Sequence, residues 1–102
     1  MISRNIRYLK EYNQKIGELK KLMDSCNEEQ LKQREEYADK MRTLVAERDD
    51  IVISVNNISP SIERLVLFYK YLCGMSDSEI KYYLNVSDKE IAEIEKKNIE
   101  PF

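Results

Sequence analysis

The sequence predicts an all-α protein, in which an N-terminal antiparallel coiled-coil helical hairpin (residues 1–58) is followed by a small three-helix helix-turn-helix domain (residues 59–102). Two heptad series of apolar residues in the first half predict the hairpin. Short amphipathic segments with capping residues predict the second domain. The composition agrees, because 35% of the 102 residues are charged while Gly and Pro number only 2 each, as is typical of exposed helices.

The composition also excludes several classes of function. Histidine is absent, and the two cysteines, Cys26 and Cys73, lie far apart without a CxxC spacing, so we expect neither a metal site nor a cofactor. No glycine-rich loop or distinctive carboxylate pair indicates an enzyme. The longest mostly apolar stretch, residues 65–73, contains Lys70 and is far shorter than the roughly 20 residues that span a bilayer. We expect a cytoplasmic protein without membrane contact.

The first helix is predicted from Ile2 to Asp24. Its apolar residues recur every seven positions in two series that lie three positions apart, as in the seam of a coiled coil. The members are Ile2, Leu9, Ile16 and Met23 in one series and Tyr12, Leu19 and Cys26 in the other.

A second heptad series, containing Leu44, Ile51 and Ile58, predicts a second helix that is out of phase with the first. Between the two, Ser25 with Glu28, or Asn27 with Gln30, forms a capping box that starts a new helix. Residues 1–26 have a net charge of +3 and residues 27–58 of −3, which favours folding back as a hairpin. The alternative is one continuous helix with a stutter that pairs with a second copy of the chain as a homodimer.

Capping and turn residues delimit three further helices. Ser59 and Pro60 start a helix that ends near Cys73, before Gly74, and whose wide apolar face makes it the expected core helix. Ser76 or Asp77 caps the next helix, which ends near Leu84, and Ser87 caps the last, which ends near Asn98. Asn85 supplies a turn residue that tolerates positive φ.

The last two helices have the spacing of a helix-turn-helix. The motif needs apolar residues four apart in its first helix, a positive-φ residue followed by an apolar one in its turn, and packing residues three apart in its second helix. These positions are Ile80 and Leu84, then Asn85 and Val86, then Ile91 and Ile94. Lys81 departs from the pattern, since a small residue usually occupies its position.

Several short motifs between residues 61 and 91 resemble the fourth region of bacterial sigma factors. Nearly the whole chain is similar in architecture to small phage-encoded transcriptional regulators that place a helical hairpin before a sigma-like helix-turn-helix. The matching motifs are Arg64-Leu65-Val66-Leu67, Tyr71-Leu72 with Gly74, Ser78-Glu79-Ile80 and Val86-Ser87. The resemblance implies a mobile-element protein that binds DNA or RNA polymerase, with its last helix in the major groove.

The candidate site is therefore the last helix and the residues beside it. The expected DNA- or partner-binding residues are Ser87, Asp88, Lys89, Glu90, Glu93, Lys96, Lys97, Lys81 and Tyr82. A basic face on the hairpin would hold the phosphate backbone, and it comprises Arg4, Arg7, Lys10, Lys20 and Lys21. Of the adjacent tyrosines, Tyr83 is expected to face the core and Tyr82 the solvent.

The acidic residues of the last helix favour a second function. Asp88, Glu90, Glu93 and Glu95 are expected at exposed positions, where they would repel phosphates and oppose counterion release. The alternative is an acidic protein-binding inhibitor from a mobile element, for example an anti-CRISPR protein, that keeps a helix-turn-helix shape and docks on a basic host nucleic-acid-binding protein. A coiled-coil adaptor that only dimerises is a third interpretation.

Overall fold

The computed structural model describes residues 1–101, and the all-α class is confirmed. The described residues contain helices and no strand, apart from one isolated bridge between Ile2 and Ile99. They group into two compact units. One, the two-helix unit, is Tyr8–Asp50. The other, the C-terminal unit, combines Met1–Arg7 with the chain from Ile51 onward.

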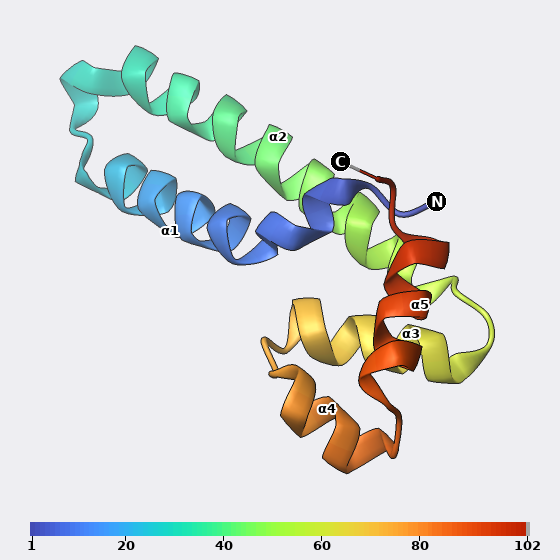
Figure 1. Cartoon of the computed structure of the whole chain (residues 1–102). Helices are drawn as coiled ribbons and strands as arrows, with labels where there is room; N and C mark the ends of the chain where they lie inside the picture. Colours follow the sequence, from blue (N-terminus) through green and yellow to red (C-terminus); the bar gives the residue numbers. More distant parts are fainter. Residues whose placement is uncertain (102) are drawn as a thin grey trace. The chain divides into compact units, whose positions relative to one another are not determined.

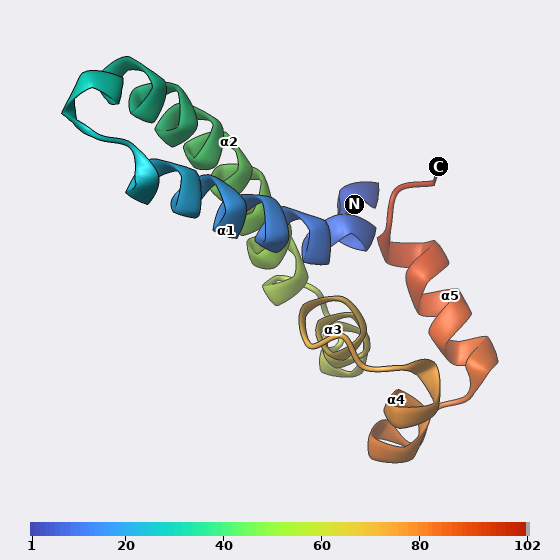
Figure 2. The ribbon, with the colours of Figure 1, turned by 90° about the vertical axis from the view of Figure 1, so that its left-hand side faces the viewer.

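The two-helix unit contains α1 (Leu9–Ser25), the short 3-10 turn η2 (Glu28–Gln30) and most of α2 (Leu31–Asn56). The two helices lie side by side and run in opposite directions (Figures 1 and 2). The Tyr12 hydroxyl donates a hydrogen bond to Glu47 Oε2 at 2.9 Å, and Arg48 Nη1 donates one to Asn13 Oδ1 at 3.1 Å. These bonds join the two helices at the end remote from the turn.

The turn between the helices is capped by Asn27. Its side chain accepts a hydrogen bond from the Glu29 backbone at 3.1 Å, and Gln30 Oε1 accepts one from the Asn27 backbone at 3.1 Å. This is the second of the two predicted capping boxes. Ser25 instead donates from its hydroxyl to the Leu22 carbonyl oxygen at 2.8 Å, at the end of α1.

The predicted start of the first helix at Ile2 is wrong. A 3-10 turn, η1 (Arg4–Tyr8), precedes α1. The Ile2 backbone pairs with the chain end, since its N–H donates to the Asn98 carbonyl at 2.8 Å and its carbonyl accepts from Glu100 N–H at 2.9 Å. Both Ile2 and Ile6 are buried in the C-terminal unit. Burial of these two side chains stabilises a chain start that is not α-helical. The heptad spacing between Ile2 and Leu9 is therefore coincidental.

The division of the chain also differs from the predicted boundary after residue 58. The end of α2 groups with the C-terminal helices, and its Ile51 and Val55 are 4% and 0% exposed. The heptad series contains Ile51 but carries no information on which part of the chain covers it.

The rest of the C-terminal unit consists of α3 (Ser61–Leu67), the π turn η3 (Phe68–Leu72), α4 (Asp77–Leu84) and α5 (Asp88–Asn98). Helix α3 begins one residue after Pro60, with Pro60 rather than Ser59 at the N-cap. Gly74 has a φ of +70° after η3, as predicted for a residue that ends a helix. Val66 of α3, Ile80 of α4 and Ile91 of α5 form the buried cluster of these three helices.

The wide apolar face predicted for the helix after Pro60 is only partly buried in α3 and η3. Val66 and Leu67 are fully buried, whereas Ile62 and Phe68 are 39% and 36% exposed. The face turned inward also contains Glu63, which is only 8% exposed. The prediction considered apolar residues only and gave Glu63 no place in the core.

Glu63 is held by two residues near the end of α5. Asn98 Nδ2 donates a hydrogen bond to Glu63 Oε1 at 2.8 Å, and Lys97 Nζ approaches Oε2 at 3.2 Å. The hydrogen bond from Asn98 and the charge of Lys97 outweigh the effect of burial and lower the pKa of Glu63 below its ordinary value of 4.5.

This lowered pKa makes the stability of the C-terminal unit depend on pH. The stabilisation is fully present above pH 4.5 and is lost as the pH falls through the lower pKa of the folded state. In Glu63→Gln we expect a loss of about 1–2 kcal/mol in the free energy of unfolding at pH 7, and a weaker decline between pH 5 and pH 3. Urea unfolding at several pH values measures both. An unchanged decline in Glu63→Gln would show that other carboxyl groups cause it.

Asn85 joins α4 to α5 in the left-handed conformation, with φ 53° and ψ 45°, as predicted. Its N–H donates to the Lys81 carbonyl at 3.0 Å and so ends α4. We expect Asn85→Val to lower the free energy of unfolding by about 1–2 kcal/mol, because a β-branched residue is strained there. Asn85→Gly is the matched control and should change it by less than about 0.5 kcal/mol. Equal losses in the two variants would argue against backbone strain as the cause.

Candidate nucleic-acid interface

Both helices of the candidate site begin at a serine N-cap. Ser76 Oγ accepts a hydrogen bond from Glu79 N–H at 3.2 Å, and Ser87 Oγ accepts one from Glu90 N–H at 3.1 Å. Each glutamate reaches back to its serine, so both ends are capping boxes. Ser87 therefore fixes where α5 starts, and the Glu90 carboxylate is occupied in the cap.

The inner side of α5 contains Ile91, which is 2% exposed, and the partly buried Ile94. Glu95 lies beside them with a side chain only 18% exposed, and its carboxylate pairs with Lys70 Nζ. The expectation that Glu95 is exposed is therefore wrong. It faces inward because Lys70, on η3, supplies a counter-charge that the spacing within α5 does not reveal.

Lys70 connects α5 to the start of α4. Besides Glu95, its Nζ contacts Asp77 Oδ1 at 3.1 Å. Burial disfavours the charged form of Lys70, but the hydrogen bonds to Glu95 and Asp77 outweigh burial and raise its pKa. The Lys70 ammonium group thus stays charged and helps to hold the two helices in place. The role of Lys70 could not be predicted, because nothing in the local sequence pattern pairs residue 70 with residue 95.

The outer side of α5 carries Lys89, Glu93 and Lys96, which are all exposed. Their spacing of four and three residues places them on one face of the helix. Ala92 is exposed beside this face. Lys97 is 66% exposed at its side chain although it pairs with Glu63. The outer face therefore has two lysines and one carboxylate at its centre, next to a small apolar residue.

Lys81 and Asp88 form an ion pair across the turn. Lys81 Nζ lies 3.1 Å from Asp88 Oδ2, and the two side chains are 37% and 73% exposed. Lys81, which stands where the helix-turn-helix pattern usually has a small residue, is thus engaged in an ion pair with the first residue of α5. The pair also compensates the negative charge of Asp88 at the start of α5.

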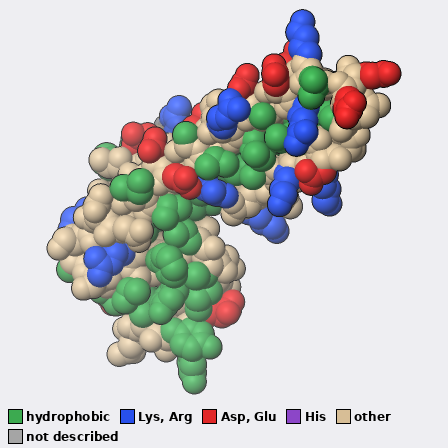
Figure 3. Space-filling model, turned by 180° about the vertical axis from the view of Figure 1, so that it is seen from behind, with side chains coloured by type: hydrophobic (Ala, Val, Ile, Leu, Met, Phe, Trp, Pro, Cys, Tyr) green, Lys and Arg blue, Asp and Glu red, His purple; other side chains and the backbone are tan. Residues whose placement is uncertain are grey.

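Tyr82 and Tyr83 of α4 are both at the surface, with exposed fractions of 82% and 65%. Their rings contact each other edge to face, with centroids 5.3 Å apart. The expectation for Tyr82 is confirmed and that for Tyr83 is wrong, because Ile80 alone of the eight residues of α4 is buried. Figure 3 shows hydrophobic side chains at the lower end of the C-terminal unit, where Figure 1 places α4.

The five residues of the predicted basic face are divided between the two units. Arg4 and Arg7 lie in η1 of the C-terminal unit, whereas Lys10, Lys20 and Lys21 lie on α1 of the two-helix unit. No one unit presents all five.

Within residues 1–101, no group of three or more Cys, Asp or Glu side chains is arranged to hold a metal ion. None of the helices in this part of the chain is long and apolar enough to cross a membrane. Comparison with protein-family models, with curated proteins and with solved structures finds no match to the chain.

Proposed function

We propose that the chain is a regulatory protein of a phage or other mobile element that binds DNA through a sigma-like helix-turn-helix formed by α4 and α5. The observation that carries the proposal is the turn between these helices. Asn85 has a left-handed backbone between two serine-capped helices, and Ile80 and Ile91 meet in one core. In this proposal α1 and α2 form a coiled-coil hairpin that accompanies the reading domain, and RNA polymerase is a further candidate partner.

The ion pairs of the C-terminal unit reduce the electrostatic objection to DNA binding. Asp88 is compensated by Lys81, Glu90 is occupied in the cap, and Glu95 faces inward to Lys70. Of the four carboxylates of α5, Glu93 is the one left at the centre of the outer face. Since Lys89 and Lys96 flank it, this face has a net positive charge and is compatible with phosphate contact.

The side chains of the outer face match the chemistry of base edges in the major groove. In this arrangement the N-terminal half of α5 enters the groove. Lysine donates to guanine O6 and N7, a carboxylate accepts from cytosine N4, and a methyl group contacts the thymine methyl. Lys89, Glu93 and Ala92 supply these three groups.

The test is equilibrium binding of the full chain to duplex DNA enriched from a random pool, followed by fluorescence anisotropy across a salt series. We expect binding whose affinity falls steeply with salt, with a slope of about −0.9 for each phosphate contacted. Failure to enrich any duplex, with no binding at about 50 mM salt, would overturn the proposal.

A second candidate function, an inhibitor that docks on a basic nucleic-acid-binding protein of the host, is favoured by the exposed pair Tyr82 and Tyr83. Tyrosine is enriched at the centres of protein interfaces, and two adjacent exposed rings are suited to such contact. Affinity capture from host lysate with the wild type and with the Tyr82→Ser, Tyr83→Ser double variant tests it. A basic protein retained by the wild type alone would support this function, and identical capture by both would contradict it.

A further inference from the structure

The two-helix unit contains an apolar seam that it does not cover by itself. Between Tyr8 and Asp50 only Leu9 is buried, and the apolar residues along the facing sides of α1 and α2 are half-buried. We call them the seam residues, and they are Tyr12, Ile16, Leu19 and Met23 of α1, Cys26 at its C-cap, and Tyr37, Ala38, Met41, Leu44 and Val45 of α2. Two helices alone leave both sides of such a seam open to water.

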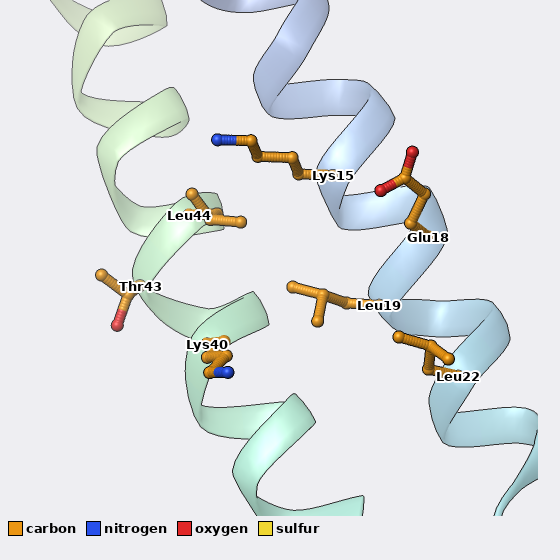
Figure 4. A pocket seen from close by; sticks show the side chains of 7 residues that line it. All are labelled: Lys15, Glu18, Leu19, Leu22, Lys40, Thr43 and Leu44. Atoms are coloured by element: carbon orange, nitrogen blue, oxygen red, sulfur yellow. The ribbon is translucent and has the colours of Figure 1, made fainter.

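One side of the seam forms an open groove of about 460 Å³. Leu19, Leu22 and Leu44 supply its apolar lining, together with the stems of Lys15 and Lys40. Leu19 points from α1 toward α2, and Leu44 points from α2 toward α1 (Figure 4). Leu22 is 44% exposed at the groove, so apolar surface is continuous from the seam to the outside.

We propose that a second copy of this chain covers the groove, with the two-helix units of both copies forming a four-helix bundle. Charge complementarity favours this occupant. Residues 8–26 carry four basic and three acidic side chains, whereas residues 27–50 carry five basic and eight acidic ones. A two-fold arrangement that places α1 of one copy beside α2 of the other brings a net positive segment next to a net negative one twice, once on each side of the axis.

The size of the face agrees with a stable dimer. The 17 residues of α1 extend over roughly 26 Å at 1.5 Å per residue, and two adjacent helices are about 20 Å wide. The projected area is thus roughly 500 Å². The accessible area of a face covered by side chains exceeds its projection, which brings it near the 800 Å² or so per partner of standard interfaces. Four-helix bundles also pack around apolar residues at heptad spacing, as the seam residues have.

Sedimentation equilibrium of the full wild-type chain over a wide concentration range tests the proposal. We expect a mass that approaches 24.4 kDa, twice the 12.2 kDa of one chain, and a thermal midpoint that rises with protein concentration, as linked folding and association require. A mass of one chain with a midpoint independent of concentration overturns the proposal, and so does a trimer or larger assembly.

Leu22→Glu locates the interface, and Leu31→Glu is the matched control. Both leucines are substantially exposed in the single chain, at 44% and 57%, but only Leu22 lines the groove. We expect Leu22→Glu to weaken dimerisation by about 100-fold or more. Because the dimer is symmetric, one substitution replaces a buried leucine in each of the two copies. Leu31→Glu should leave the dimer intact.

Far-UV circular dichroism at equal concentration verifies that each variant keeps its helices. If Leu22→Glu is not folded, the milder Leu22→Gln takes its place and should still weaken association more than Leu31→Gln. A dimer that survives substitution at Leu22, in a folded variant, contradicts the assignment of this groove as the interface.

Discussion

Ile80→Ala should lower the free energy of unfolding of the C-terminal unit by about 2–5 kcal/mol. Ile80 is fully buried and forms the central cluster with Val66 and Ile91. Truncation removes three carbon atoms from this cluster and leaves a cavity, because α3, α4 and α5 all surround the site. Since small domains are stable by only about 5–15 kcal/mol, this loss is a large part of the total. Urea unfolding monitored by circular dichroism measures it.

Ile62→Ala is the matched control for Ile80→Ala. It makes the same chemical change on α3, but Ile62 is 39% exposed, so we expect a loss below about 1 kcal/mol. Similar losses in the two variants would contradict the position of the core between α3, α4 and α5.

Lys89→Glu should weaken the proposed DNA binding by about 10- to 100-fold, which corresponds to about 1–3 kcal/mol. Lys89 is exposed on the outer face of α5 in its first turn, where a recognition helix meets base edges. A glutamate there replaces a cation with an anion near the phosphates. The fold should not suffer, because an acidic residue near a helix N-terminus is favourable.

Lys32→Glu makes the same change of net charge at an exposed position in the first turn of α2, outside the candidate site. Anisotropy titrations of both variants with the same duplex at one salt concentration separate a local contact from a general charge effect. We expect the affinity of Lys32→Glu to lie within about threefold of the wild type. Equal weakening by both variants would show that net charge alone governs the affinity.

Several helix starts and the turn at Asn85 could be predicted from sequence because they depend on neighbouring residues. Ser87 is predicted as a cap outright, and Ser76 and Asn27 are each one of two predicted alternatives. All three side chains accept hydrogen bonds from backbone groups within a few positions. The positive φ of Asn85 likewise follows from the residue type and its place between two amphipathic segments.

The predictions that proved wrong depend on contacts between residues far apart in the sequence. Ile2 meets Ile99, and Glu63 meets Asn98, at separations that no periodicity encodes. The exposure of Tyr83 has a related cause, since only the packing of α3 and α5 decides which side of a short helix is covered.

The charge of the candidate site also depends on contacts that the sequence pattern does not reveal. Counted along the sequence, α5 has four carboxylates on or near the surface that we propose to read DNA. In three dimensions Glu95 pairs with Lys70, and Asp88 pairs with Lys81 across the turn. The outer face is thus less acidic than the sequence of α5 suggests, as the proposed DNA binding requires.

The most direct test of the proposed function is the set of backbone amide NMR signals that shift when the full chain is titrated with its enriched DNA duplex. We predict that the largest shifts fall on Ser87 and on the outer face of α5, at Lys89, Ala92, Glu93 and Lys96. Shifts confined to α1 and α2, or to Tyr82 and Tyr83 of α4, would contradict the proposal that α5 reads DNA.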